Sequence, residues 1–390
     1  MSPIANDGDV LLTGATGFLG MELLVRYLER TERTVIAPVR AEDQEQARVR
    51  MQRVLETLVG RADAYADRVI AIAADIERDG LGLSRADRDR VGSQATEFVH
   101  CAATVSFHAG LEESRQTNVR GTRQVLELAE QCARRGALRR LTHVSTAYVA
   151  GTHRGAFGEN DLDVGQRFRN PYERSKYEAE RLVRTRADAL PAVTILRPSI
   201  IVGESGTGWT PSFNVLYVPL RAFAQRQLRV LPATPTAPVD VVPVDHVADA
   251  AIELAGRDEQ GLNTYHLVAG ERASSVAELV DLSAQLLHRV PPPIVSPQLY
   301  RTVRPVLFAC SGGRRRAALR RAGPFLPYYT MNVRYRRDHA RRRLDPVGLE
   351  PPALQTYYEC LLRYAAATEW GRSPLPRHAV HPSDPEEQTD

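Results

Sequence analysis

The only lysine of the chain, Lys176, follows Tyr172 by four residues. Residues four apart lie on one face of a helix, so the ammonium would lie near the phenol and favour its ionised form. The other 50 residues of the Lys+Arg count are arginine. A compact ammonium can pass on a proton whereas a guanidinium stays charged, so the two do not replace one another at a proton relay. The pair therefore predicts a proton-donor site, and a half-buried aromatic residue beside a cation is the alternative.

A helix that positions this pair should begin just before it. Asn170 suits the N-cap of a helix and Pro171 its first position. Two hydroxyl residues, Ser145 and Thr146, end the strand predicted over residues 141–144. In open α/β sheets ligands bind outside the carboxyl ends of the strands, so these hydroxyls are candidates for the same site.

Three glycines, Gly14, Gly17 and Gly20, follow the strand predicted at residues 10–12 and precede the helical pattern of residues 21–30. At this spacing the missing side chains allow a tight turn, a close approach of the backbone to a pyrophosphate, and packing of the helix on the strand. The N-terminus of the helix then faces the phosphates. The motif predicts a dinucleotide site, with a purely structural turn as the alternative.

The second predicted strand, residues 34–39, ends where a carboxylate would bind the ribose hydroxyls of NAD. Val39 and Arg40 occupy that position instead. A cation there suits a 2′-phosphate, so we expect NADPH rather than NADH. Glu42 and Asp43 follow closely, and a solvated arginine at the strand end is the alternative.

Further cofactor contacts are expected at the ends of the next two strands. Asp75 and Ile76 follow the strand predicted over residues 69–74, where they could meet an adenine, although Asp75 would serve equally as a loop cap. The small residues at 102–104 follow the strand predicted over residues 98–101 and would let a flat cofactor lie against the backbone.

Two other polar residues have alternative roles. Asn118 precedes the helix predicted over residues 119–135. It is either an ordinary N-cap or a polar group that holds water near Lys176. Cys101, on the expected cofactor strand, is expected to be a small apolar filler rather than a catalytic nucleophile.

Strands and helices continue to alternate as far as residue 287, with strands expected near residues 193–196 and 265–267. Alternation on this scale predicts an α/β fold with a Rossmann-like, doubly wound parallel sheet. We assign residues 1–290 to this NADP-binding domain, with substrate-binding insertions at about residues 204–240.

Three prolines at residues 291–293 mark a boundary. Residues 291–372 would form a smaller, basic and mostly helical substrate or lid region. The Pro-rich, polar residues 373–390 would be a disordered tail. Within the insertions, the glycine-rich residues 203–209 predict a mobile loop at the rim of the cleft.

The composition is that of a soluble globular protein, with 43% hydrophobic and 25% charged residues. The N-terminus shows no export signal, and no apolar run approaches the roughly 18 residues of a spanning helix. The four cysteines lack C-x-x-C spacing, which argues against a disulfide framework and against a metal site. A cytoplasmic protein is therefore expected.

Basic residues are concentrated late in the chain. Residues 301–343 hold thirteen arginines and one acidic residue, Asp338, a balance of +12, so the net charge of +4 leaves −8 for the rest. Such asymmetry predicts an anionic partner for this segment, such as an anionic membrane surface. A subdomain with solvated arginines is the alternative, and no nucleic acid is expected. The aromatic and apolar residues of this segment, which suit a lid, are Tyr300, Leu307, Phe308, Phe325, Tyr328 and Tyr329.

The motifs at residues 13–20, 100–107, 117–122 and 143–149, together with the Tyr172 and Lys176 pair, resemble a known family. This family is the extended short-chain dehydrogenase/reductases. Within it, the motifs resemble the branch of fatty acyl-CoA reductases and thioester reductases, which has a male-sterility-type NAD(P)-binding domain. The resemblance covers roughly residues 8–290, and the C-terminal hundred residues share it only faintly. It implies NADPH-dependent reduction of an acyl thioester, carried on CoA or on an acyl carrier protein, to an aldehyde and, with a second hydride, to an alcohol.

The resemblance also implies residue roles: Thr146 as hydrogen-bond donor to the carbonyl, Tyr172 as proton donor, and Lys176 at the nicotinamide ribose. The candidate catalytic residues are Thr146, Tyr172, Lys176 and Asn118. The candidate cofactor-binding residues are Gly14, Thr16, Gly17, Phe18, Leu19, Gly20, Arg40, Asp75, Ile76, Ala102, Ala103, Thr104, Tyr172, Lys176 and Pro198.

Two other functions remain open. A nucleotide-sugar epimerase or dehydratase, or another extended oxidoreductase, could use the same scaffold; an epimerase would hold NAD tightly, and Arg40 argues against it. A non-catalytic NADP-binding regulatory protein could keep the fold without the chemistry. The presence of Thr146, Tyr172 and Lys176 argues against that reading.

Overall fold

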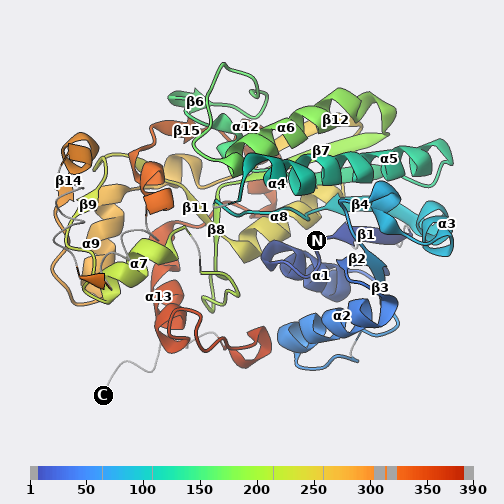
Figure 1. Ribbon diagram of the computed structural model, residues 1–390, viewed down its shortest axis with the longest axis horizontal. Helices are drawn as coiled ribbons and strands as arrows, with labels where there is room; N and C mark the ends of the chain where they lie inside the picture. Colours follow the sequence, from blue (N-terminus) through green and yellow to red (C-terminus); the bar gives the residue numbers. More distant parts are fainter. Residues whose placement is uncertain are drawn as a thin grey trace.

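The computed structural model describes residues 8–381, apart from residues 64, 108, 214, 258, 303–311 and 314–322. A seven-stranded sheet with the order β12-β7-β5-β4-β1-β2-β3 forms the centre of the fold (Figure 1). All neighbouring strands are parallel. The strands are β1 (Asp9–Thr13), β2 (Val35–Arg40), β3 (Val69–Ala74), β4 (Ala95–His100), β5 (Arg140–Val144), β7 (Ala192–Pro198) and β12 (Gly261–Leu267). The predicted Rossmann-like, doubly wound sheet is confirmed.

Helices cover both faces of this sheet, as Figure 1 shows. On one face α1, α2 and α8 share an apolar core with the sheet, and on the other α3, α5 and α6 share a second core. The helices are α1 (Phe18–Arg30), α2 (Gln44–Val59), α3 (Arg85–Gln94), α4 (Leu111–Arg115), α5 (Gly121–Arg134), α6 (Pro171–Arg186) and α8 (Val244–Ala255). The chain builds β1 to β3 outward and then returns to place β4 on the other side of β1. The strand order reverses there, so a crevice is expected beyond the carboxyl ends of β1 and β4.

One predicted helix start is wrong. A π-helical turn, Gln116–Arg120, joins α4 to α5, so Asn118 lies within a continuous helical stretch and is not an N-cap. The physical reason is that the first turn begins at Leu111, behind Gly110, and the Asn118 amide bonds to groups outside its own helix. Single π-helical turns within helices occur frequently at functional sites.

A third apolar core lies beyond the carboxyl end of the sheet and combines residues from both sides of the expected boundary at residue 290. Four small two-stranded sheets contribute to this region, and two of them join a strand before that boundary to one after it. Those two pairs are β9 (Leu231–Pro232) with β14 (Ile294–Val295), and β6 (Gly155–Phe157) with β15 (Val333–Tyr335). The other two are β8 (Ile200–Val202) with β11 (Val241–Pro243), and β10 (Pro238–Val239) with β13 (Ser274–Ser275). The helices here are α7 (Tyr217–Ala224), α9 (Val276–Leu286), α12 (Asp338–Leu344) and α13 (Tyr358–Ala367). Residues before and after the prolines at 291–293 therefore share one apolar core, so these prolines do not mark a boundary between two cores.

The glycine-rich residues 203–209 do not form the rim loop that the sequence suggested. Trp209 is buried, and a side chain on Gly208 would overlap the backbone of Cys360 in α13. The loop closes on itself through the backbone, with Gly208 N donating to Glu204 O at 2.8 Å. It is packed beneath the C-terminal helix because Trp209 needs an apolar site.

The expected disorder from residue 373 onward is also wrong for residues 373–381. The Leu375 carbonyl accepts hydrogen bonds from Trp209 Nε1 at 3.1 Å and from the Tyr364 hydroxyl at 3.2 Å. Arg377 pairs with Glu204 at 2.5 Å and with the buried Glu22 at 3.3 Å. A guanidinium that neutralises two carboxylates holds this segment in place, and residues 382–390 lie outside the described part of the chain.

The described arginines after residue 330 are mostly ion-paired. The pairs are Arg336 with Asp338, Arg337 with Asp345, Arg341 with Glu271, and Arg343 with Glu259. This part of the expected anion-binding segment is therefore largely neutralised within the protein. The arginines of the segment that lie outside the described residues are Arg304, Arg314, Arg315, Arg316, Arg320 and Arg321. Among the described residues, no helix combines the length and apolar character needed to cross a bilayer.

Candidate active site

Helix α6 begins as predicted. The Asn170 side chain accepts a hydrogen bond from Glu173 N at 2.9 Å, and Pro171 occupies the first turn. The fully buried Glu173 carboxylate accepts from Arg169 N at 2.8 Å and from the Tyr328 hydroxyl at 2.9 Å. The N-terminus of α6 is thereby fixed on both sides, which sets the direction in which Tyr172 leaves the helix.

Lys176 lies one turn further along α6 and is buried. Its ammonium donates to the Val144 carbonyl, at the end of β5, at 2.7 Å. Burial lowers the pKa of Lys176 to about 8, because a charged group is costly to remove from water. A lysine with this pKa can hold or release a proton near neutral pH.

Thr146 and Tyr172 meet beside this lysine. Burial raises the pKa of Tyr172 to about 12, and a hydrogen bond with the Thr146 hydroxyl opposes that rise. The Thr146 hydroxyl also donates to the Pro198 carbonyl, at the end of β7, at 3.3 Å. The expectation that Lys176 would favour a tyrosinate is corrected here: the Lys176 ammonium bonds to Val144, and the phenol keeps its proton. A protonated Tyr172 is the form that can act as a donor.

Asn118 connects the segment after β4 to α6. Its amide oxygen accepts from Thr104 N at 2.8 Å, and its amide nitrogen donates to Thr104 O at 3.1 Å and to the Ser175 hydroxyl at 2.9 Å. Ser175 precedes Lys176, so Asn118 fixes the distance between α6 and the expected cofactor strand. The predicted water near Lys176 stays a prediction.

The glycine turn after β1 leaves no room for side chains. Gly14 has a φ of 77°, and a Cβ there would lie 2.7 Å from Ala102 N, across the crevice between β1 and β4. A Cβ on Gly20 would overlap the Gly14 carbonyl oxygen. Gly17 is the N-cap of α1 and donates to Gly14 O at 2.8 Å. Gly14 thus forms the tight turn and Gly20 the close helix packing that the motif predicts, and the approach of a pyrophosphate stays a prediction.

The other residues of the glycine motif face in different directions. Thr16 and Phe18 are half-buried, and the Phe18 ring meets the Trp209 ring edge-on at 6.2 Å. Leu19 is buried in the core, so only its backbone can meet a cofactor. The loop that contains Trp209 therefore packs against Phe18, next to the glycine turn.

A chain of buried polar groups supports the same crevice. The Thr13 hydroxyl lies 2.8 Å from His100 Nδ1, and His100 Nε2 lies 3.0 Å from the Thr122 hydroxyl. Thr13 Oγ1 also accepts from Ala102 N at 3.3 Å. Burial lowers the pKa of His100 to about 3, so its imidazole is neutral. Sequence reasoning placed His100 in a motif but did not assign it this supporting position.

Two arginine side chains lie at the tip of β2, Arg40 from the strand itself and Arg50 from α2. Arg40 is exposed at the last position of the strand, and the Arg50 guanidinium of α2 donates to the Arg40 carbonyl. Sequence reasoning missed Arg50 because it lies ten residues away. Asp75 caps its own loop, with Oδ1 accepting from Glu77 N at 3.0 Å, and the Ile76 side chain packs where a Cβ on Gly121 would lie. The loop-cap alternative for Asp75 is therefore present in the structure, and the adenine contact stays a prediction.

An aromatic cluster lies beside Tyr172 and contacts it through Phe107. The Phe107 ring centroid lies 5.8 Å from Tyr172, 5.3 Å from Phe325 and 5.5 Å from Tyr328, with which it is stacked. The Tyr328 ring in turn meets Tyr148 edge-on at 4.9 Å. Of the residues expected to form a lid, Phe325 and Tyr328 are in this cluster. Leu307 and Phe308 lie outside the described residues, and Tyr300 and Tyr329 are buried elsewhere.

Cys101 follows β4 and lies close enough to Lys176 for their charges to interact. Burial raises the pKa of its thiol to about 12, and the nearby Lys176 charge offsets only part of that rise. A thiol with this pKa is not a thiolate nucleophile at neutral pH. This agrees with the expected role as a small apolar filler.

Known proteins share these features. The family model described as Male sterility protein matches residues 12–251. The chain is 33% identical over 279 residues to the nonribosomal peptide synthetase asaC of Aspergillus flavus, which covers 67% of this chain and 26% of that protein. It is 32% identical over 287 residues to fatty acyl-CoA reductase 1 of Homo sapiens, covering 63% of this chain and 54% of that protein.

A solved structure extends the match. The terminal R domain from the myxalamid PKS-NRPS biosynthetic pathway has a TM-score of 0.80 and 26% identity, and the match covers 95% of this chain and 94% of that one. The chain thus spans about a quarter to a half of these curated relatives but nearly the whole of this solved domain. The structural match includes the region after residue 290, where the sequence motifs are weak.

Proposed function

The chain belongs to the male sterility protein family, and from this premise we propose that it is an NADPH-dependent reductase that converts an acyl thioester to an aldehyde. The observation that carries the proposal is the convergence of Thr146, Tyr172 and Lys176 at the carboxyl ends of β5 and β7. This group lies beside the crevice in which open α/β sheets bind dinucleotides.

The residues present fit a nicotinamide cofactor. The glycine turn would hold the pyrophosphate at the N-terminus of α1, because added side chains there would overlap backbone. When bound, the cofactor supplies a hydride for the thioester carbonyl carbon. The two arginines at the tip of β2, Arg40 and Arg50, support a preference for the 2′-phosphate of NADPH.

Two hydroxyls would stabilise the negative charge that develops on the carbonyl oxygen. Thr146 and Tyr172 already share a hydrogen bond and are held by Pro198 and α6, so they need little reorganisation. A preorganised donor of this kind is worth roughly 3 kcal/mol. Tyr172 would donate the proton, since its raised pKa keeps it protonated at neutral pH.

Lys176 would hold a ribose hydroxyl and return a proton to Tyr172. Its ammonium is buried one helical turn from the phenol, and its pKa of about 8 allows transfer in both directions near neutral pH. The resulting hemithioacetal then loses its thiol to leave the aldehyde. A second hydride delivered to the aldehyde carbon, with a second proton donated to its oxygen by Tyr172, would produce an alcohol.

The thioester donor in this proposal is an acyl-CoA or a carrier-bound acyl group. The similarity to a fatty acyl-CoA reductase and to an R domain of a synthetase supports both. We also propose a reducing, cytoplasmic location. The three described cysteines, Cys101, Cys132 and Cys360, are free thiols, as is usual in that compartment.

The test is NADPH oxidation with a panel of acyl-CoAs, acyl carrier proteins, aldehydes and UDP-sugars, with products identified by mass spectrometry. We expect NADPH consumption and an aldehyde with the thioesters. Conversion of a UDP-sugar without net NADPH use would favour the epimerase alternative. Tight NADPH binding without turnover of any substrate would favour a regulatory protein.

A further inference from the structure

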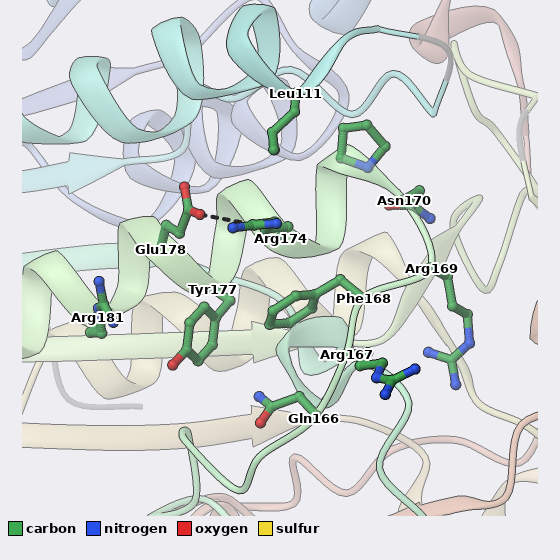
Figure 2. Close-up of a pocket in the computed structure, with 11 residues that line it drawn as sticks. Leu111, Gln166, Arg167, Phe168, Arg169, Asn170, Arg174, Tyr177, Glu178 and Arg181 are labelled. Atoms are coloured by element: carbon green, nitrogen blue, oxygen red, sulfur yellow. Dashed lines mark hydrogen bonds and ion pairs between the residues drawn. The ribbon is translucent and has the colours of Figure 1, made fainter.

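A cleft of about 670 Å³ lies along the face of α6 that carries Arg174, Tyr177, Glu178 and Arg181 (Figure 2). Its walls come from α6 and the segment before it, with Leu111 at the start of α4 on the other side. This volume is within the range of sites for small organic molecules. The mechanism above does not use it.

The cleft is strongly basic. Four arginines line it, Arg167, Arg169, Arg174 and Arg181, against a single acidic residue, Glu178. Their formal balance is +3, in a chain whose total is only +4. The cleft therefore concentrates positive charge beside the catalytic helix, which attracts anions.

The single carboxylate is already neutralised. Arg115, which lies outside the cleft lining, donates to Glu178 at 2.8 and 2.7 Å, and Arg174 adds a third contact at 3.1 Å, drawn in Figure 2. The hydrogen bonds from Arg115, followed by those from Arg174, hold the pKa of Glu178 below its usual range despite partial burial. Glu178 thus fixes the Arg174 guanidinium in position without cancelling the charge of Arg167.

Arg167, Arg174 and Arg181 are exposed, whereas Arg169 is half-buried and donates to the Gly151 carbonyl and to the buried Glu173. Arg174 contacts Glu178 through Nε, which leaves its other two nitrogens for a ligand. Arg181 lies over the Tyr177 ring, at 5.9 Å. Tyr177 and Phe168, whose ring centroids are 4.9 Å apart, form an apolar part of the cleft lining.

A continuous set of contacts leads from this cleft to the proton donor. Asn170 lines the cleft and donates to the Tyr328 hydroxyl at 2.8 Å. Tyr328 is stacked on Phe107 at 5.5 Å, and the Phe107 centroid lies 5.8 Å from Tyr172. Asn170 and Pro171, which line the cleft, directly precede Tyr172 in the chain, so the cleft lies at the start of α6, next to the residue expected to donate the proton.

We propose that this cleft binds the phosphate at the far end of the pantetheine arm of the thioester donor, with Arg167 and Arg174 as its contacts. The inference rests on the proposed function, because that function requires a donor of this kind. Both CoA and a carrier protein present the acyl group on a pantetheine arm that ends in a phosphate ester. Arginine binds such a group through charge-assisted hydrogen bonds.

The experiment compares kcat/KM for one acyl group on four donors: pantetheine, 4′-phosphopantetheine, CoA and a carrier protein. The proteins are the wild type, the double variant R167Q/R174Q, and the matched control R48Q/R363Q. The control removes two arginines that are about half exposed, on α2 and α13. We expect the wild type and the control to prefer each phosphorylated donor over pantetheine by about tenfold, since exposed charge pairs contribute modestly. The double variant should lose that preference.

A second readout separates this inference from the proposed function. Calorimetric titration with 4′-phosphopantetheine should show binding to the wild type that R167Q/R174Q weakens about tenfold and that 0.5 M salt also weakens. If no thioester is reduced but this binding is found, the proposed function fails and the cleft assignment stands. Equal donor preference in wild type and double variant, or an effect confined to the carrier protein, would overturn the assignment. So would a sedimentation change showing that the cleft joins two copies of the chain.

Discussion

The glycine turn after β1 and the aromatic cluster beside Tyr172 are built from different kinds of contact. At the glycine turn, backbone meets backbone: Gly20 lies against Gly14, and Gly14 against Ala102. In the aromatic cluster, side chains from distant segments meet, as when Phe107 stacks on Tyr328. A site made of backbone tolerates no added atom, whereas a site made of side chains can be changed one group at a time. The two ends of the active site should therefore respond differently to mutation.

The largest effect is expected where the two ends meet, at Tyr172 and Lys176. Lys176→Arg keeps the charge but places a larger, permanently protonated group in a buried site, so we expect kcat to fall on the order of a hundredfold or more. Tyr172→Phe should lose at least as much. The double variant should be little worse than either, because residues that act as one unit are not additive.

Melting curves of these variants with and without NADPH separate lost chemistry from lost folding. A Lys176→Arg protein that folds and keeps nearly normal kcat would refute the role assigned to Lys176.

At the glycine turn, one added methyl group should be enough to weaken both folding and cofactor binding. Gly20→Ala places a Cβ onto the Gly14 carbonyl oxygen, and overpacking of this kind costs roughly 1–3 kcal/mol. We expect a lower melting temperature and NADPH affinity reduced at least tenfold, both measured by thermal shift and fluorescence titration. Gly110→Ala is the matched control, because a Cβ there meets nothing within 4 Å. If both variants bind NADPH equally, the close-packed turn is not needed for cofactor binding.

The pH dependence of the reaction tests the roles of Tyr172 and Lys176 without a mutation. The pKa of Lys176 is lowered to about 8 and that of Tyr172 is raised to about 12. Lys176 is thus charged below pH 8 and loses its proton as the pH rises past that value, while Tyr172 stays protonated. We expect kcat/KM to fall about tenfold per pH unit above about pH 8. This decrease of kcat/KM at high pH should be absent in Lys176→Arg. A wild-type profile that is flat to pH 9.5 would contradict the role assigned to the Lys176 proton.

Much of the backbone end could be predicted because its determinants are local in sequence. The glycine spacing, the Asn170 cap and the strand β3 (Val69–Ala74) were read from neighbouring residues alone, and the structure has the same features. Asn118 shows the limit of local reading. Its cap-like residue type suggested a helix start, but a tertiary contact to Thr104 uses its amide instead.

At the aromatic cluster, Phe325 and Tyr328 were predicted as lid residues, but their contacts could not be predicted because these cross most of the chain. The stacking of Phe107 on Tyr328 depends on how the segment after residue 290 packs, and no local pattern encodes that. The same holds for Arg377, which finds Glu22 and Glu204 only in the folded chain. A polar, Pro-rich tail was therefore expected to be disordered although part of it has specific partners.

A charge reversal at the tip of β2 should change cofactor choice without touching the aromatic end. Arg40 is exposed, so Arg40→Asp should fold normally and place a carboxylate where a 2′-phosphate is expected. We expect the wild type to bind NADPH at least tenfold more tightly than NADH, about 1.4 kcal/mol, and the variant to lose that preference. Arg53→Asp, on the exposed side of α2, is the control. Equal affinity of the wild type for both cofactors would rule out the NADPH assignment.

The smallest effect is expected from a single hydroxyl at the side-chain end. Tyr328→Phe keeps the ring that stacks on Phe107 but removes the hydroxyl that accepts from Asn170 at 2.8 Å and donates to Glu173 at 2.9 Å. A hydrogen bond of this kind contributes about 1 kcal/mol, so KM for the thioester should rise roughly fivefold. Because the contact lies at the N-terminus of α6 and not at the glycine turn, the dissociation constant for NADPH should be unchanged. The pKa of Glu173, already raised by burial, should rise further, so the defect should grow as the pH is lowered.

Tyr329→Phe is the matched control, since Tyr329 lines a separate apolar pocket with Leu220 and Phe223. Steady-state kinetics with the thioester and titration with NADPH, done on both variants, decide the matter. A Tyr328→Phe protein that loses NADPH affinity as much as it gains KM would show that the two ends of the site are one mechanical unit, and the distinction between backbone-built and side-chain-built ends would fail.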